Sequence, residues 1–283
     1  MKTLVVKSYA KINLALNVKG VFADGYHDLD MINLPLELHD TLLINNTEST
    51  GFNTVTMDDY SLGTGFSKTA VYGIDILQKN TNYKNKTHVM IHKVIPMKAG
   101  LGGGSSNTSF IMKAINSKYN LGLSNETLAE MSLPIGSDCP FFIYCKPARV
   151  QGRGEVVKEI PFVDYYVLLV KPEKGCSTKE IYDSVDPHKC IHPNIDKIEE
   201  ALKNGNEDEL SSLIGNSLQE TAAKFVPEIN QVIKELKEYG FKIVSMTGSG
   251  SSVFALTKDK KFAKKAEKYF DKKYKTILTK TLK

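Results

Sequence analysis

Residues Ile95 to Phe110, "IPMKAGLGGGSSNTSF", place four glycines and three serines between an apolar segment and a segment with helical spacing. A glycine loses more backbone freedom on folding than any other residue. A run of glycines is therefore tolerated where the chain needs a positive φ or where another group approaches the backbone closely. We expect such a group beside the four glycines, Gly100, Gly102, Gly103 and Gly104.

The flanks of this stretch predict a strand, a turn and a helix in that order. "THVMIHKVI" (87–95) is typical of a strand. After the glycines, one face of a helix is marked by Phe110, Ile111, Ala114, Ile115 and Tyr119. The open N–H groups and the dipole at a helix N-terminus form an anion site, and phosphate is a usual occupant. The alternative is a glycine turn that only packs.

Two well-known phosphate-binding patterns were compared with this loop. The P-loop requires G-x-x-x-x-G-K-[ST], but Ser105 follows Gly104 and no lysine comes next. The dinucleotide pattern G-x-G-x-x-G is met only loosely, with Ser105 in the place of the last glycine. The loop therefore fails the first pattern and is only a weak match to the second.

The rest of the chain predicts an α+β fold, a sheet covered by helices. The first half is rich in strands, among them "KINLALNVKG" and "DMINLPLELHDTLLIN", with a hairpin turn at Asp24-Gly25. A helix is expected from the spacing of Phe66, Ala70, Val71, Ile74 and Leu77. Beyond a boundary near residue 157, strands alternate with helices, and one helix ends at Gly240 as its C-cap.

The composition is that of an ordinary globular protein, with 283 residues, 41% of them hydrophobic and 24% charged. No apolar run approaches the roughly 20 residues that cross a bilayer, and lysines interrupt the N-terminal apolar residues. We therefore expect a cytoplasmic protein with no membrane partner. The four cysteines lie far apart, which favours reduced thiols over zinc or disulfides: Cys139, Cys145, Cys176 and Cys190.

The net charge of +5 arises at the C-terminal end of the chain. Residues 258–283 hold eleven lysines and three acidic residues, which leaves 26 basic and 29 acidic residues elsewhere. Such a segment is either a nucleic-acid surface or a solvated helix, and the helix is favoured because the chain contains only two arginines. No nucleic-acid partner is expected. The inward face of the helix would consist of Phe262, Ala266, Tyr269 and Phe270.

Five segments together resemble the motifs of the GHMP kinases, whose members phosphorylate small molecules with ATP. They are "AKINLALNVKGVFADGYHDL", "IPMKAGLGGGSSN", "LPIGSDCPFF", "VQGRGE" and "MTGSGSSVFAL", the last being the third motif of the family. The resemblance implies a two-domain GHMP kinase fold. Residues 1–157 would form a ribosomal-protein-S5-like N-terminal domain, and residues 158–283 a ferredoxin-like C-terminal α+β domain.

The resemblance also implies roles for single residues. Asp138 corresponds to the general base that faces the acceptor hydroxyl, and Lys11 to the lysine that pairs with it. Taken alone, Asp138 before Pro140 is more typical of a helix N-cap. The implied phosphate donor is ATP with Mg²⁺, whose protein ligands stay unassigned. The implied ATP-binding residues are Lys93, Pro96, Gly100, Leu101, Gly102, Gly103, Gly104, Ser105 and Ser106, and the third-motif turn consists of Gly248, Ser249 and Gly250.

The combination of "AKINL", "DGYH", "GLGGGSS" and "GSDCPFF" resembles members whose acceptor alcohol carries a cytidine diphosphate. Aromatic side chains recognise a base by stacking, which contributes about 1–3 kcal/mol per base. The resemblance assigns the base to Tyr26, His27 and Tyr182, and a further substrate contact to Asn13. The implied partner is a small-molecule substrate, a cytidyl diphosphate sugar alcohol, bound by a monomer or homodimer.

Two positions depart from the pattern of the family. Asn107 stands where an aspartate is usual, and Gly65 where an asparagine contacts the nucleobase. We expect Asn107 to accept the same cap-type hydrogen bonds. The departures leave two alternatives open: a GHMP kinase for another alcohol, such as homoserine or mevalonate, and a catalytically silent nucleotide-binding protein. The aromatic residues of "DGYH" argue against the first.

Overall fold

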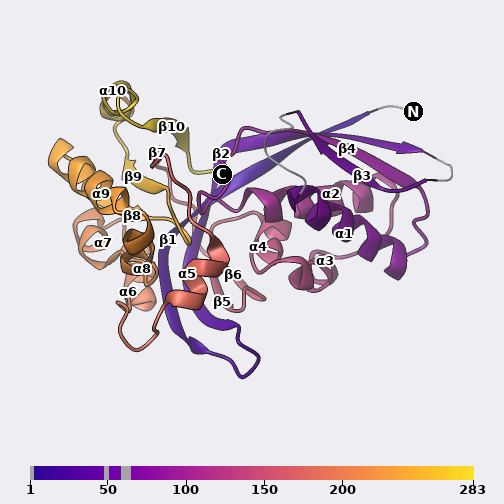
Figure 1. Ribbon diagram of the computed structural model, residues 1–283, viewed down its shortest axis with the longest axis horizontal. Coiled ribbons are helices and arrows are strands. Elements are labelled where there is room, and N and C mark those ends of the chain that lie inside the picture. The colour runs from indigo at the N-terminus through magenta and orange to yellow at the C-terminus, as the bar shows by residue number, and fades with distance from the viewer. Residues whose placement is uncertain (1–2, 48–50, 59–64) are drawn as a thin grey trace. The chain divides into compact units, whose positions relative to one another are not determined.

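The computed structural model describes residues 3–47, 51–58 and 65–283, which divide into two compact units (Figure 1). The first unit consists of Met1–Ala10, Leu38–Pro96 and Gly102–Cys145. The second consists of Lys11–Glu37, Met97–Leu101 and Lys146–Lys283. Each unit is therefore assembled from segments that lie far apart in the sequence. The single domain boundary near residue 157 stays a prediction.

The first unit packs helices against a sheet. Two long strands, β1 (Leu4–Val21) and β2 (His27–Thr47), contribute residues to both units. In the first unit, β2 pairs antiparallel with β4 (Lys86–His92), and β3 (Thr54–Met57) pairs parallel with β4. The helices are α1 (Gly65–Asn80), α2 (Gly103–Lys118), α3 (Asn125–Ser132), the 3₁₀ helix η2 (Leu133–Ile135) and α4 (Cys139–Tyr144).

The core of the first unit confirms the helices expected from the apolar spacing. Ile74 and Leu77 of α1 and Ile111 and Ile115 of α2 are buried in one cluster with the sheet residues. The side chain of Phe66 lies outside the described residues. The predicted strand 87–95 ends early, at His92. Its end is explained by Asp40, whose Oδ1 accepts the N–H groups of Val94 and Ile95 at 2.8 Å each, so these amides have no place in a strand ladder.

A hairpin and two further strands form one part of the second unit. The turn between β1 and β2 lies at the predicted Asp24-Gly25, where Gly25 has a φ of 87° and Phe22 N–H donates to Tyr26 O at 2.7 Å. The beginning of β2 pairs with β5 (Ala148–Gly152), and β5 pairs with β6 (Val156–Glu159). The hairpin prediction is confirmed.

A four-stranded antiparallel sheet forms the other part of the second unit, in the order β10-β7-β9-β8. Its strands are β7 (Tyr166–Lys171), β8 (Ile243–Met246), β9 (Val253–Thr257) and β10 (Lys275–Lys280). In chain order these run 4-1-3-2, with helices between the first two and the last two, which is the ferredoxin-like arrangement. The helices are α5 (Thr178–Ser184), α6 (Ile195–Lys203), α7 (Glu207–Leu213), α8 (Gln219–Phe225), α9 (Glu228–Tyr239) and α10 (Lys260–Phe270).

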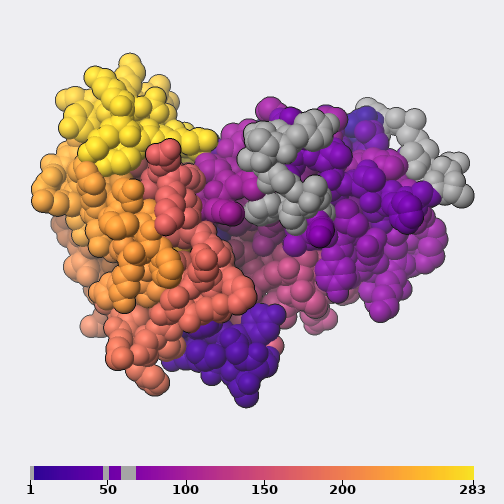
Figure 2. All heavy atoms as spheres, in the orientation of Figure 1, coloured from indigo at the N-terminus to yellow at the C-terminus, as the bar shows by residue number. Residues whose placement is uncertain are grey.

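The ends of two helices test finer predictions. Helix α9 ends at Gly240, which has a φ of 115° and acts as the predicted C-cap. Helix α10 buries Ala263, Ala266 and Phe270, and its lysines are exposed. The C-terminal segment that contains this helix lies at the surface of the second unit (yellow, Figure 2). The prediction that Tyr269 faces inward is wrong, since its side chain is 60% exposed. Positions 263, 266 and 270 define the buried stripe, and position 269 lies on the flank of that stripe.

No helix in the described part of the chain is both long and apolar enough to cross a membrane.

Candidate active site

The glycine loop, Gly100 to Ser106, ends in an open helix N-terminus. The first intrahelical bond of α2 runs from Ser106 N–H to Gly102 O at 2.9 Å, so the N–H groups of Gly103, Gly104 and Ser105 precede the helical ladder. The φ angles of Lys98, Gly100 and Gly102 are 51°, 73° and 69°. Left-handed residues at alternate positions turn successive amides in one direction and form an anion-binding concavity. The positive φ expected from the glycines is present at two of the four.

The group that lies against Gly100 belongs to the protein itself. A Cβ on Gly100 would lie 2.0 Å from Thr247 O, and Thr247 Oγ1 donates to Gly100 O at 3.2 Å. Gly100 and Thr247 both belong to the second unit. The close approach expected from the sequence is therefore explained, at this glycine, by the third-motif turn, Thr247 to Ser252.

Lys93 lies at the helix end of the glycine loop, within the first unit. Its Nζ donates to Asp40 Oδ2 at 2.8 Å and to Ile95 O at 2.7 Å. The same Nζ is 3.0 Å from the point that a Cβ on Gly103 would occupy. Burial lowers the pKa of Lys93, and the Asp40 carboxylate opposes that change. The sequence reasoning missed Asp40, although a carboxylate inside the apolar strand "LELHDTLL" is a usable signal.

The segment around Asp138 is hydrogen-bonded to the glycine loop and to helix α2. Ser109 Oγ donates to Cys139 O at 2.9 Å, and Cys139 Sγ donates to Ser105 O at 3.8 Å. Burial raises the pKa of Cys139 to about 12, so this thiol keeps its proton. Asp138 occupies the N-cap position of α4, but its side chain accepts no hydrogen bond from the first amides of that helix. The N-cap role that the sequence favours in isolation is therefore absent.

Ser106 and Asn107 are buried and hydrogen-bonded inside the first unit. Ser106 Oγ donates to Tyr9 O at 2.6 Å, and Ser8 Oγ donates to Asn107 Oδ1 at 2.7 Å. Ser106 is fully buried and Asn107 is 3% exposed. The expectation of cap-type hydrogen bonds to Asn107 is wrong, because Asn107 is the fifth residue of α2 and bonds to β1 instead. A neutral amide at this site avoids the burial of a charge.

Lys11 and Asn13 form a polar cluster in the second unit. Lys11 Nζ donates to Asn13 Oδ1 at 2.6 Å, and Asn13 Nδ2 donates to Asn33 Oδ1 at 2.6 Å. The backbone N–H of Asn13 donates to Thr247 Oγ1 at 2.9 Å, and that of Lys11 to Leu101 O at 3.1 Å. Both side chains are buried, at 3% and 1% exposure. The second unit thus brings Lys11, Asn13, the third-motif turn and the first part of the glycine loop together.

The third-motif turn itself is held by side chains outside it. Asn216 Nδ2 donates to Met246 O and to Gly248 O, both at 2.9 Å, and Asn216 is 1% exposed. The hydroxyls of Ser249 and Thr178 lie 3.0 Å apart. Asn216 and Thr247 are residues that the sequence reasoning missed, since nothing in their local pattern indicates a partner.

The predicted base-binding residues are all in the second unit. Tyr26 is 57% exposed, and the Arg153 guanidinium lies 5.1 Å from its ring centroid. The rings of His27 and Tyr182 lie 5.0 Å apart and are tilted by 54°. Burial lowers the pKa of His27, and Asp183 opposes that change. The side chains of His27 and Tyr182 are therefore neighbours, and their role in base binding stays a prediction.

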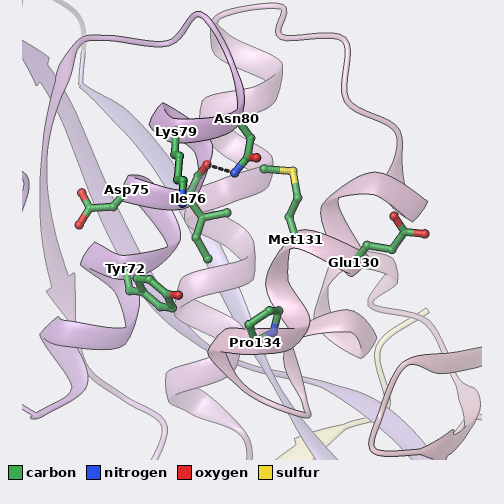
Figure 3. A pocket seen from close by; sticks show the side chains of 8 residues that line it. All are labelled: Tyr72, Asp75, Ile76, Lys79, Asn80, Glu130, Met131 and Pro134. Atoms are coloured by element: carbon green, nitrogen blue, oxygen red, sulfur yellow. Dashed lines mark hydrogen bonds between the residues drawn. The ribbon is translucent and has the colours of Figure 1, made fainter.

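One pocket of about 460 Å³ lies in the first unit, between α1 and the α3–η2 segment (Figure 3). None of the predicted site residues lines it. Its lining residues are Tyr72, Asp75, Ile76, Lys79, Asn80, Glu130, Met131 and Pro134. Within residues 3–47, 51–58 and 65–283, no group of three or more His, Cys, Asp or Glu side chains is placed to hold a metal ion.

The chain matches the models of two family domains. Residues 68–146 match the GHMP kinases N terminal domain, and residues 189–276 match the GHMP kinases C terminal model. Together these matches cover more than half of the sequence, and they include α2, α4 and most helices of the second unit.

Comparisons with single proteins agree with the family match. The 4-diphosphocytidyl-2-C-methyl-D-erythritol kinases of Bacillus cereus (strain B4264) and Bacillus anthracis (strain CDC 684 / NRRL 3495) are each 34% identical over 259 residues, which cover 89% of this chain and 88% of theirs. A crystal structure of 4-(cytidine 5'-diphospho)-2C-methyl-D-erythritol kinase matches with a TM-score of 0.82 at 25% identity, over 99% of this chain and 100% of that one.

The fold is also found in kinases with other substrates. A homoserine kinase from Cytophaga hutchinsonii matches with a TM-score of 0.76 at 16% identity, over 100% of this chain and 95% of that one. That likeness concerns the fold alone. The chain belongs to the GHMP kinase family, in the group that contains the 4-diphosphocytidyl-2-C-methyl-D-erythritol kinases.

Proposed function

We propose that the chain is a phosphotransferase that moves the γ-phosphoryl group of ATP to the 2-hydroxyl of 4-diphosphocytidyl-2-C-methyl-D-erythritol, a step of the non-mevalonate isoprenoid pathway. The observation that carries the proposal is the contact between the Asp138 segment and the glycine loop, through Cys139 and Ser105. Phosphoryl transfer depends mainly on alignment and on neutralisation of charge. The open helix N-terminus neutralises charge on the phosphates, and the Asp138 carboxylate aligns the acceptor hydroxyl.

Each half of the proposed reaction has its own residues. In the first unit, the N–H groups of Gly103, Gly104 and Ser105 and the Lys93 ammonium hold phosphate oxygens, and Asp138 takes the proton of the acceptor hydroxyl. In the second unit, Lys11 supports the oxygen that attacks, Asn13 orients Lys11 through their 2.6 Å hydrogen bond, and the third-motif turn supports Gly100. The pairing of Lys11 with Asp138 is part of the proposal.

The oxygen atoms near the glycine loop are suitable ligands for a magnesium ion that binds together with ATP. Mg²⁺ binds mostly through substrate phosphates, waters and one or two protein oxygens. The half-buried Ser105 hydroxyl, 3.3 Å from the Cβ position of Gly136, and the Asp138 carboxylate are such oxygens, whereas Asn107 is already engaged with Ser8. Bound there, Mg²⁺ would neutralise charge on the transferred phosphoryl group.

The acceptor is proposed to bind through its base. His27 and Tyr182, whose rings are 5.0 Å apart, and the exposed Tyr26 provide aromatic surface for a cytosine. The cytidyl substrate follows from the names of the relatives at 34% identity, and the aromatic cluster supports it. A monomer or homodimer in the cytoplasm is the predicted form.

An acceptor panel tests the proposal by coupled measurement of ADP release. With 4-diphosphocytidyl-2-C-methyl-D-erythritol as acceptor we expect turnover that Asp138→Asn lowers by about 100-fold or more, the usual contribution of a positioned general base. Turnover only with homoserine or mevalonate would assign a different acceptor. Binding of ATP without turnover of any acceptor would instead indicate a silent nucleotide-binding protein, and would refute the proposal.

A further inference from the structure

Asp40 is a fully buried carboxylate to which neither the motifs nor the proposed reaction gives a role. It lies on β2, and both of its oxygens are occupied. Oδ1 accepts the N–H groups of Val94 and Ile95 at 2.8 Å each, and Oδ2 accepts from Lys93 Nζ at 2.8 Å. Asp40 therefore fixes both the backbone after β4 and the side chain of Lys93.

Lys93 keeps one donor that the protein does not use in these contacts. An ammonium has three N–H groups, and two of them go to Asp40 and to Ile95 O. Nζ lies 3.0 Å from the Cβ position of Gly103, the first residue of α2. The third N–H is thus at the same helix end as the open amides of Gly103, Gly104 and Ser105.

Stability alone does not explain the buried ion pair of Lys93 and Asp40. Side chains of Lys93 and Asp40 are 5% and 0% exposed, and the desolvation of such a pair offsets much of its attraction. Two apolar residues of similar volume would often serve the fold as well. The placement of the ammonium at an anion-binding helix end gives the pair a different use.

We propose that Asp40 is a positioning residue for nucleotide binding. It holds the Lys93 ammonium against Gly103, where the third N–H of the ammonium donates to an oxygen of the β- or γ-phosphate. Asp40 does not touch the nucleotide, because its own oxygens are filled by Lys93, Val94 and Ile95. Its bonds to the backbone serve the fold, and its effect on the nucleotide is exerted through Lys93. The inference rests on the proposed function for the identity of the ligand, a nucleoside polyphosphate.

The first test is Asp40→Asn, measured by calorimetric binding of ATP and AMP. The Asn carbonyl oxygen can still accept from the amides of Val94 and Ile95, but its NH₂ group then faces the Lys93 ammonium, donor against donor. We expect the Kd for ATP to rise about 10- to 100-fold, as for a lost charge-assisted hydrogen bond. The Kd for AMP, which lacks the β- and γ-phosphates, should change less than about twofold.

A second variant, Lys93→Met, keeps the test open if Asp40→Asn does not fold. It removes the ammonium and retains the length of the side chain, and we expect the same loss with ATP and not with AMP. In the double variant the two losses should not add, because the effect of Asp40 on the nucleotide is exerted through Lys93. Additive losses, or equal losses for ATP and AMP, would overturn the proposal.

The matched control is Asn46→Ala, on the same strand six residues further on. Asn46 is 2% exposed, and it bonds to Tyr83, Thr87 and Lys118, so its loss disturbs a comparable buried polar cluster. We expect a lowered Tm and an unchanged Kd for ATP. If Asn46→Ala weakens ATP binding as much as Asp40→Asn, the role of Asp40 is structural only.

The outcomes separate this inference from the proposed function. If no acceptor is phosphorylated but ATP binding still depends on Asp40 and Lys93, the positioning role stands and the kinase reaction falls. If the cytidyl acceptor is phosphorylated and the Asp40→Asn variant binds ATP normally, the kinase reaction stands and the positioning role falls.

Discussion

The two Gly/Ser turns, the glycine loop (100–106) and the third-motif turn (247–252), look alike as sequence and differ in the structure. Every residue of the third-motif turn is buried, and three of its four hydroxyls, those of Thr247, Ser249 and Ser251, bond within the second unit, for example Ser251 Oγ to Lys174 O at 2.7 Å. In the glycine loop, residues 102–105 are half-exposed and their amides start a 16-residue helix. The third-motif turn is followed by strand β9.

The difference teaches that Gly/Ser composition alone does not identify an anion site. In the third-motif turn, the N–H groups of Thr247 and Gly250 donate to carbonyls of the same turn, and the strand that follows adds little dipole. A helix, by contrast, leaves its first N–H groups open and adds its dipole. Here the third-motif turn supports the glycine loop, because its Thr247 carbonyl fills the space beside Gly100. Substitutions in the third-motif turn should therefore affect mainly stability. Substitutions at the helix end of the glycine loop should affect mainly ligand binding.

The largest effect is expected from Gly100→Ala, at the contact between the two turns. The added Cβ would lie 2.0 Å from Thr247 O at a φ of 73°, which predicts a loss of more than about 4 kcal/mol in unfolding free energy. The control is Gly122→Ala, with a φ of 71° and no atom within 4 Å of the Cβ. It should lose only about 1–2 kcal/mol. Urea unfolding measures both, and equal losses would contradict the contact.

The next effect is expected from Asn216→Ala, which removes the support of the third-motif turn. Met246 O and Gly248 O would each lose the hydrogen bond from Asn216, and Met246 O would keep only the long one from Ser245 Oγ at 3.5 Å. The unfolding free energy should fall by about 2–4 kcal/mol. Asn206→Ala is the control, since Asn206 caps α7 at the surface and otherwise bonds to the exposed Glu209 side chain. It should lose about 1 kcal/mol. Thermal unfolding separates the two, and a reversed order would show that the turn does not need Asn216.

Local features of the molecule could be predicted from the sequence. The helix faces of α1 and α2, the hairpin at Asp24-Gly25 and the C-cap at Gly240 depend on neighbours within a few residues. The ferredoxin-like sheet was implied by the family resemblance, and the strand order confirms it. The two Gly/Ser turns were both found, because glycine and serine dominate their composition.

The partners of those features could not be predicted, because they come from distant parts of the chain. Lys93 and Asp40 are 53 residues apart, and Thr247 and Gly100 are 147 apart. Asn107 was expected to cap a helix, but helix α2 begins four residues earlier and directs the amide at Ser8. The roles of Lys11 and Asp138 as a catalytic pair stay predictions that the acceptor panel tests.

At the helix end of the glycine loop, Gly103→Ala should weaken nucleotide binding while stability changes little. Alanine favours the helix by about 1 kcal/mol over glycine, but its Cβ would lie 3.0 Å from Lys93 Nζ and 3.2 Å from Ile95 Cγ2. The ammonium must move, and we expect about a tenfold rise in the Kd for ATP. Gly122→Ala should leave the Kd unchanged. An unaltered Kd in Gly103→Ala would place the phosphates elsewhere.

The smallest effect is a dependence of ATP binding on alkaline pH, which the third-motif turn cannot produce because it contains no titratable side chain. Burial lowers the pKa of Lys93 below its ordinary 10.5, with Asp40 and Asp58 opposing the change. Between the lowered pKa and 10.5 the unfolded chain holds a proton that the folded chain has released, so stability rises with pH in this window. The nucleotide prefers the charged ammonium, so its affinity falls over the same window. Calorimetry from pH 8 upward should give a Kd that rises a few-fold for ATP and stays level for AMP, and a parallel rise for AMP would remove Lys93 from the phosphate site.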